Sequence, residues 1–471
     1  MMRVTRGLAP YQVLQRDRNG CASAVVGGTL VGLGATRLAV RVLRGGRPLR
    51  GFAGRCAGRA VNGRWTARLH GLPAGGPYTV VFQAGLESVA VPHVLVGDVW
   101  IMAGQSNMVG DGLVRDALPP HPLVHAFYAW DEWCVAREPV HFPAGAVDPV
   151  YAAQPLTGRA KILAAHRRAV KGAGLGVAFG RAMVRRTGVP QGLIPCAAGG
   201  TSLDQWSPRL RHKGGHSLYG AMLRRVRRQD QPVAGMLWYQ GEADTRSDPR
   251  AYARKMRALI LAVRKDLRLP ALPWLMVQLG KTHLFDEQES EQPGFLAVRE
   301  QQRRLAQTIR RLSVVPAIDL PMEDGIHLDA HGQIALGERL ARVACFQLTA
   351  GRGARDGIAL KRLRLVPCPL NWGKCPAIEV TFTHVTGGLC SDGVPSGFRL
   401  TTPDGKVLKR IHKVLLAGPR AVVVPYTYPD FSMKGYRLAY GYDLDAYCNI
   451  HDAEGMGLPA FAPQPIEPLP I

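Results

Sequence analysis

The stretch Val99-Trp100-Ile101-Met102-Ala103-Gly104-Gln105-Ser106-Asn107-Met108 decides the fold of this chain. It begins with an apolar run and continues through a glycine turn into a serine. In α/β hydrolases, a strand that ends in such a turn exposes a nucleophilic serine at the carboxyl edge of a parallel sheet. The common Gly-x-Ser-x-Gly elbow is absent, because position 108 is Met. Ser106 is therefore the candidate nucleophile, and the rest of the chain has to supply its partners.

Apolar runs and helical patterns alternate through residues 94–350, which predicts a parallel sheet with helices on both faces. Core strands are expected near residues 97–103, 191–197, 234–240, 273–279 and 313–318. Helices are expected near residues 174–187, 217–229, 250–267, 294–311 and 331–345. The long irregular stretch 111–172 is typical of segments that line an active site above a sheet edge.

A serine hydroxyl needs a general base, and the base needs an orienting acid. His327 follows the last predicted strand, so it falls on the same sheet edge as Ser106. Asp324 lies three residues earlier, a spacing that lets a carboxylate in a turn reach the imidazole Nδ1–H and leaves Nε2 to take the serine proton. A cap at Asp324 with His327 on the surface is the alternative, and the placement of both residues after a strand favours catalysis.

Acyl transfer also needs hydrogen-bond donors for the oxyanion. Gly199 and Gly200 follow a second strand and let a backbone N–H approach a ligand closely. Gln240 ends a third strand, and its side-chain amide can donate. The alternatives are that these glycines only turn the chain and that Gln240 only caps its strand.

Four blocks of the chain resemble the SGNH (GDSL-like) hydrolase superfamily, and within it the sialate O-acetylesterase-like group. The blocks are Gly97–Met108, Gly199-Gly200-Thr201 with Trp206, Trp238–Asp244 and Asp324–Leu328. The resemblance implies a flavodoxin-like three-layer α/β/α core with Ser106 as nucleophile, His327 as base and Asp324 as orienting acid. It also implies an oxyanion hole formed by Ser106, Gly200 and Gln240. Residues beside these groups are candidates for binding the substrate: Gln105, Asn107, Thr201, Glu242 and Asp244.

The resemblance implies a serine carbohydrate esterase that removes O-acetyl groups from a sugar through an acyl-enzyme, with an O-acetylated carbohydrate as its partner and no cofactor or metal. An acetylxylan-type polysaccharide deacetylase and a non-catalytic carbohydrate-binding protein on a hydrolase scaffold are the alternatives. Trp206, Trp238 and Tyr239 could stack on a sugar ring or pack in the core. Glu242 and Asp244 could orient neighbours instead of contacting a substrate.

Length predicts more than one domain, since 471 residues exceed a single compact core. Short apolar runs between glycine-rich turns predict a β-sandwich-like N-terminal domain over residues 1–93. The hydrolase domain would span residues 94–350, and a β-rich, sandwich-like C-terminal domain residues 351–471.

The net charge is +25, from 60 basic and 35 acidic residues. Arginines fill the polar faces of amphipathic helices, which indicates solvated surfaces rather than specific nucleic-acid binding. Such a surface would still attract anionic sugars such as sialates or uronates. No apolar run approaches the ~18 residues of a membrane helix, so no membrane partner is expected. The start of the chain lacks a signal-peptide core, which predicts a cytoplasmic protein, or an exported one if a leader has been removed.

The nine cysteines form no Cys-x-x-Cys pair, so no zinc site is predicted. The sequence predicts neither an oligomeric state nor a disulfide pairing.

Overall fold

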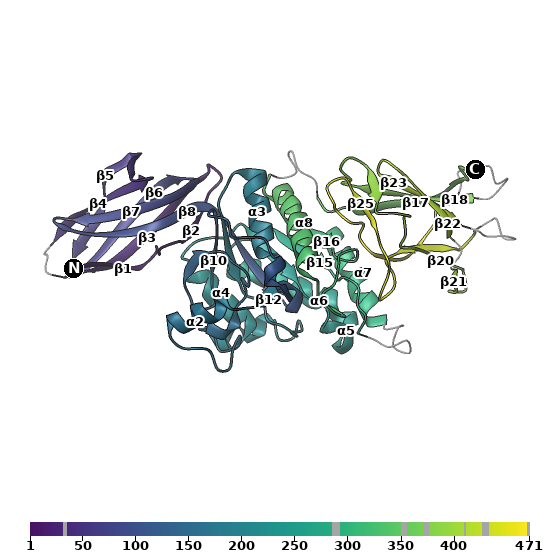
Figure 1. Ribbon diagram of the computed structural model, residues 1–471, viewed down its shortest axis with the longest axis horizontal. Coiled ribbons are helices and arrows are strands. Elements are labelled where there is room, and N and C mark those ends of the chain that lie inside the picture. Colours follow the sequence, from purple (N-terminus) through teal and green to yellow (C-terminus); the bar gives the residue numbers. More distant parts are fainter. Residues whose placement is uncertain are drawn as a thin grey trace.

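The computed structural model describes residues 1–31, 35–284, 293–349, 356–370, 376–408, 411–425 and 433–468. Three regions follow one another along the long axis of the molecule (Figure 1): an N-terminal β region, a central region of strands and helices, and a C-terminal β region. The fold class predicted from the sequence is confirmed.

The N-terminal region is one twisted antiparallel sheet with strand order β1-β3-β6-β5-β4-β7-β8. Apolar side chains alternate along its strands and enclose a core of their own, which includes Trp65 and Phe82. The strands are β1 (Met2–Arg6), β3 (Cys21–Leu30), β4 (Thr36–Arg44), β5 (Arg47–Val61), β6 (Arg64–Pro73), β7 (Gly75–Ala84) and β8 (Glu87–Gly104). A short strand, β2 (Val13–Gln15), runs parallel to β8.

The central sheet has the strand order β11-β10-β13-β8-β14-β15-β16, and only β11 runs antiparallel to its neighbour. Its strands are β10 (Val124–Phe127), β11 (Trp133–Val135), β13 (Gln191–Pro195), β14 (Gly235–Tyr239), β15 (Trp274–Gln278) and β16 (Leu312–Pro316). β13, β14 and β15 are buried along their full length, as expected for parallel strands covered on both faces. The five core strands lie within a few residues of their predicted positions, and β10 and β11 were not predicted.

The main helices divide between the two faces of this sheet. α3 packs on α8, and α6 packs on α7. β13 is added on one side of β8, whereas β14, β15 and β16 are added on the other side. Because parallel crossovers are right-handed, this reversal puts α4, α6 and α7 on the face opposite α3 and α8. These helices are α3 (Gly176–Thr187), α4 (Leu218–Arg227), α6 (Tyr252–Asp266), α7 (Pro293–Thr308) and α8 (Ala330–Thr349). Shorter helices are α1 (Ser106–Val109), α2 (Arg159–Arg167) and α5 (Asp244–Ser247).

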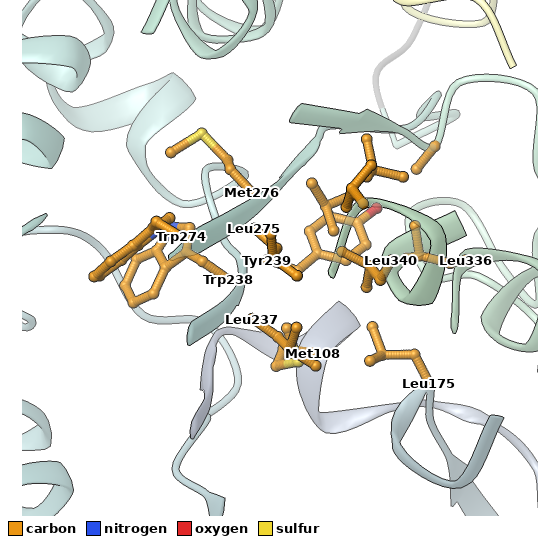
Figure 2. Packing of buried hydrophobic residues seen from close by; sticks show 14 of the residues in the cluster. Met108, Leu175, Leu237, Trp238, Tyr239, Trp274, Leu275, Met276, Leu336 and Leu340 are labelled. Carbon is orange, nitrogen blue, oxygen red and sulfur yellow. The ribbon is translucent and has the colours of Figure 1, made fainter. Parts of the chain in front are cut away.

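Side chains of β14 alternate between these two layers (Figure 2). Trp238 lies on the side of Trp274, whereas Tyr239 lies towards Leu340 of α8. Trp206, Trp238 and Tyr239 are each at most 1 % exposed. These three aromatic residues therefore pack in the core, and none is available to stack on a sugar.

The described residues of the C-terminal region form two four-stranded antiparallel sheets and a two-stranded ribbon, β19-β25. The first sheet has the order β17-β18-β23-β22, and the second β21-β20-β24-β26. Their bounds are β17 (Ala359–Pro367), β18 (Pro376–Thr383), β19 (Leu389–Ser391), β20 (Phe398–Thr401), β21 (Val407–Leu408), β22 (Ile411–Ala417), β23 (Arg420–Pro425), β24 (Arg437–Tyr440), β25 (Ile450–Asp452) and β26 (Phe461–Pro465). Their buried side chains belong to the same apolar cluster as the central sheet.

β8 joins the N-terminal and central regions as one strand. It pairs with β7 up to Val96 and with β13 and β14 from Asp98 onward. The expected boundary between residues 93 and 94 falls inside this strand. The described cysteines are all free thiols, and among the described helices none has the length and hydropathy to cross a membrane.

Candidate functional site

Ser106 follows the carboxyl end of β8, at the turn predicted from the sequence. Gly104 has a φ of +142°, and a Cβ placed on it would lie 2.0 Å from the carbonyl oxygen of Tyr239 on β14, so this position requires glycine. The Gln105 N–H then donates to that carbonyl at 2.9 Å. Ser106 opens the short helix α1, so its N–H has no intrahelical acceptor. Met108, which replaces the usual elbow glycine, is fully buried and anchors α1 in the core.

His327 and Asp324 occupy the loop between β16 and α8 and contact each other. Asp324 Oδ2 lies 2.8 Å from His327 Nδ1, and Asp324 Oδ1 accepts the N–H groups of Ile326 and His327. Burial tends to raise the pKa of Asp324, but hydrogen bonds from the His327 side chain and these two N–H groups outweigh it and lower the pKa to about 2. The carboxylate is therefore charged at neutral pH and leaves His327 Nε2 free.

Asn107 holds the serine turn and the histidine loop together. Its Nδ2 donates to the Ile326 carbonyl at 3.0 Å and to Glu242 Oε1 at 2.8 Å, and its Oδ1 accepts the Leu328 N–H at 3.0 Å. Asn107 is 1 % exposed, so it is a positioning residue and does not reach a substrate. No hydrogen bond joins Ser106 Oγ to His327 within the described residues, and such contacts are often long before substrate binds.

The loop after β13 returns to the end of β8, where the Ala198 N–H donates to the Gly104 carbonyl at 3.1 Å. This contact brings Gly199 beside Ser106, because a Cβ added to Gly199 would lie 3.8 Å from the Ser106 Cβ. Gly200 has a φ of +66° and faces open space. The glycine block thus lies beside the serine, as its position after a second strand predicted.

Gln240 does not have the free donor that the oxyanion role requires. Its side chain is fully buried, and its Nε2 donates to the Thr201 carbonyl and to Asp244 Oδ2, so both N–H bonds are used within the protein. Flipping the amide would set Oε1 against two acceptors. We correct the prediction for this residue: Gln240 connects the glycine loop to the start of α5.

Asp244 and Glu242 are also buried and serve internal contacts rather than a substrate. Asp244 Oδ2 accepts the Leu203 N–H in addition to Gln240, and burial raises the pKa of both carboxyls. Two roles were considered from the sequence for Glu242 and Asp244, binding of a substrate and orientation of neighbouring residues. Their burial favours the orientation of neighbouring residues.

Gln105 and Thr201 remain at the edge of the site. Gln105 is 4 % exposed, and its Oε1 accepts the N–H groups of Gly241 and Ala243, whereas no hydrogen bond from its Nε2 is found among the described residues. Gln105 thus carries the free side-chain amide that Gln240 lacks. The Thr201 hydroxyl donates to the Ala198 carbonyl and accepts from Trp206.

A cavity of about 350 Å³ opens next to the glycine loop. Its walls are Val109, Ala129, His141, Phe142, Pro143, Val150, Tyr151, Pro195, Ala197, Ala198, Gly199, Thr201 and Gln205. Six of these wall residues come from the irregular stretch 111–172, which was predicted from the sequence to lie above the sheet edge and line an active site. None of the wall residues is Lys, Arg, Asp or Glu.

His141 is the histidine on the wall of this cavity, and the sequence did not single it out. Its Nε2 lies 3.4 Å from the Met102 carbonyl, and burial lowers its pKa to about 3, so the ring is neutral. No short motif marks His141, because its position depends on how the long excursion folds over the sheet. Its neighbours Phe142 and Tyr151 supply aromatic surface.

One group of described residues has a spacing that could hold a metal ion: Asp111, Asp324 and His327, whose ligand atoms lie within 4.8 Å of one another. His327 Nδ1, the atom that such an ion would need, already contacts Asp324 Oδ2. The arrangement therefore suits an acid–histidine pair better than a cation site.

A serine, a histidine held by an aspartate, and a glycine loop lie at one edge of a parallel sheet, an arrangement that fits the class of ester hydrolases. Residues 96–345 match the family described as carbohydrate esterase, sialic acid-specific acetylesterase. The chain belongs to this family, which confirms the resemblance seen in the sequence.

Individual relatives agree with this assignment. A probable carbohydrate esterase of Arabidopsis thaliana is 31 % identical over 271 residues, or 52 % of this chain and 88 % of that protein. The human sialate O-acetylesterase is 26 % identical over 43 % of this chain and 42 % of its own length. A carbohydrate acetylesterase of Xanthomonas citri shares the fold over 98 % of this chain and 99 % of its own, with a TM-score of 0.65 and 21 % identity.

Proposed function

We propose that this protein is a serine O-acetylesterase that removes acetyl groups from a carbohydrate. The observation that carries the proposal is the 2.8 Å contact between Asp324 and His327 in a loop that Asn107 ties to the turn of Ser106. An inactive sugar-binding relative would not need this arrangement. The family to which the chain belongs supports an ester of a sugar as the substrate class.

The proposed reaction has two halves. His327 Nε2 takes the Ser106 proton as Oγ attacks the acetyl carbonyl. The tetrahedral intermediate collapses with cleavage of the bond to the sugar oxygen, which takes the proton from His327 and leaves as a hydroxyl group. Water then attacks the acetyl-enzyme with His327 again as base, which releases acetate and restores Ser106. Asp324 holds the imidazole tautomer throughout.

The oxyanion that forms in both halves needs donors other than Gln240. We assign the backbone N–H groups of Ser106 and Gly200, which lie at the start of α1 and in the loop beside it. Gln105 Nε2, for which no acceptor is found among the described residues, offers a side-chain donor next to Ser106. We include it as a third contact for the oxyanion or the acetyl group.

The cavity walls favour a neutral acetylated sugar over a sialate. A sialate carboxylate would find no cation among the wall residues. Asp111 and Asp324 both lie close to His327 Nδ1, and in the described part of the chain Lys171 is the cation paired with Asp111. Phe142 and Tyr151 offer surface for a sugar ring, and neutral His141 offers an acceptor for a hydroxyl. This supports the acetylxylan-type alternative within the acetylesterase class.

The first test replaces the nucleophile. Ser106→Ala should lower hydrolysis of 4-nitrophenyl acetate by at least about three orders of magnitude, because triad members act as a unit. Ser207→Ala changes a serine between β13 and α4 whose side chain makes no helix-capping hydrogen bond, and it should keep full activity. A folded Ser106→Ala protein with undiminished turnover would refute the assignment.

The second test compares substrates at equal concentration. Acetate release from acetylated xylan and acetylated neutral monosaccharides should exceed release from O-acetylated sialic acid by at least about tenfold in kcat/KM, since like charges at a binding site are costly. A preference for the sialate would contradict the neutral-cavity argument and leave the esterase assignment intact.

A further inference from the structure

The N-terminal region carries a charge pattern that the catalytic site does not explain. Between Asp17 and Glu87 the sequence has no acidic residue and no lysine. The same segment contains ten arginines: Arg18, Arg37, Arg41, Arg44, Arg47, Arg50, Arg55, Arg59, Arg64 and Arg68. Arginine without lysine or any counter-charge, over so long a stretch of strands, indicates a surface built for anions.

Five of these arginines share one side of the sheet. Arg37 and Arg41 on β4, Arg59 on β5, and Arg64 and Arg68 on β6 are all exposed, and they alternate with buried residues such as Leu38, Ala60, Trp65 and Ala67 that face the core. We call these five residues the arginine face. Figure 1 shows their strands in the N-terminal region, at the opposite end of the molecule from the C-terminal region.

The register of the strands brings these charges together. Arg37 lies directly opposite Arg59, and Arg59 lies opposite Thr66, which is flanked on its own strand by Arg64 and Arg68. Directly opposed like charges destabilise an antiparallel pair. Among the described residues no carboxylate forms an ion pair with any of the five, although Arg16 of the same region is paired to Asp98.

The kind of anion follows from the side chains present and absent. A guanidinium presents a planar fork of donors that matches a carboxylate or a phosphate, whereas lysine does not. All four aromatic residues of this segment, Phe52, Trp65, Tyr78 and Phe82, are buried, so the face lacks the stacking platforms that proteins use for unpaired nucleotide bases.

We propose that the arginine face binds a polysaccharide that carries carboxylates, such as a uronate polymer, outside the catalytic cavity. The choice of a carbohydrate rests on the proposed function, whereas the choice of a polyanion rests on the face itself. Acetylated neutral units of the same polymer would then be held near the esterase by its acidic units. The neutral cavity and the arginine face would thus bind different parts of one polysaccharide molecule.

The experiment measures binding of polygalacturonate by isothermal titration at about 50 mM and about 200 mM salt. The wild type should bind with salt-sensitive affinity, and neutral xylan should bind more weakly. Arg37→Ser/Arg59→Ser should weaken polygalacturonate binding roughly 5- to 20-fold, because it removes two exposed charges from the contact. Arg254→Ser/Arg437→Ser, with the same charge change at exposed positions on α6 and β24, should bind like the wild type.

Three results would overturn the proposal. Equal weakening by both double variants would show a general charge effect, and equal binding of wild type and Arg37→Ser/Arg59→Ser would show that the face is not involved. Tighter binding of duplex DNA or of phosphatidylserine vesicles than of polygalacturonate would assign the face to another partner. Ser106→Ala should bind the polymer normally, and Arg37→Ser/Arg59→Ser should hydrolyse 4-nitrophenyl acetate normally, so failure here and failure of the esterase assignment are separate outcomes.

Discussion

The two β-rich ends of the molecule relate to the central sheet in opposite ways. The N-terminal sheet encloses its own apolar core, whereas the buried residues of the C-terminal sheets merge with the core of the hydrolase. Buried Arg299 of α7 donates to the Gly441 and Asp443 carbonyls, and Gln278 of β15 exchanges two hydrogen bonds with Ala460. Both ends are β-rich, but among the described residues only the C-terminal region shares its apolar core with the central sheet. The stability of the central sheet is therefore expected to depend on the C-terminal region.

The largest expected effect comes from one matched pair of core truncations. Phe82→Ala and Phe461→Ala each remove a phenyl ring that is at most 1 % exposed, and each should cost about 3–5 kcal/mol. Phe461→Ala should lower the temperature of half-inactivation of the esterase, while Phe82→Ala should not.

Hydrogen exchange read by mass spectrometry supplies the control for this pair. Faster exchange in Phe82→Ala should be confined to the N-terminal strands β1–β7. Loss of protection in β14 and β15 of that variant would mean that the two cores unfold as one, and the contrast between the ends would be wrong.

A smaller effect is expected from the ion pairs at the two junctions. Arg339 of α8 binds Asp319 through two hydrogen bonds and also donates to the Gly455 carbonyl, with 6 % of its side chain exposed. Arg16 binds Asp98 in the same two-bond manner but is 27 % exposed. In urea unfolding, Arg339→Met should lower the free energy of unfolding by about 3 kcal/mol, and Arg16→Met should lower it by about 1.5 kcal/mol. Equal losses of unfolding free energy in the two variants would contradict the expected difference between the C-terminal and N-terminal junctions.

The smallest expected effect is the response to acid. Glu300 accepts the Ala462 N–H of β26 and pairs with Arg303 and Arg304. Burial acts to raise its pKa, but these ion pairs and hydrogen bonds prevail and hold it below the ordinary value of 4.5. The unfolded chain therefore takes up the proton first on acidification, so this contribution is complete above about pH 5 and is lost as the pH falls further.

Acidification to pH 4 should thus lower the melting temperature of the hydrolase and C-terminal unit, with Glu300 contributing about 1 kcal/mol or less. The N-terminal region has two acidic residues in its first 93 positions, Asp17 and Glu87, and should respond less. Glu300→Gln serves as the control, since its unfolding should be less sensitive to acid than that of the wild type. A larger acid response of the N-terminal transition would contradict the comparison.

Much of this arrangement could be predicted from the sequence, because parallel strands and their connecting helices have strong apolar periodicity. The contact of Asp324 with His327 was predicted from their three-residue spacing together with their placement after the last predicted strand. The role expected for Gln240 failed, since a residue at a strand end can point inward, and only the fold shows that Thr201 and Asp244 occupy its donors. His141 was missed because the path of a long excursion depends on tertiary packing.

Because β8 runs from the N-terminal sheet into the central sheet, the number of its residues matters as well as their side chains. One continuous strand pairs with β7 at its start and delivers Ser106 at its end. Inserting a single residue in its middle would reverse every side chain beyond that point and advance the turn by about 3.3 Å. Substitutions on the solvent side of the N-terminal sheet, outside the arginine face, leave the position of Ser106 unchanged, whereas a change in the number of residues between that sheet and Ser106 would move it.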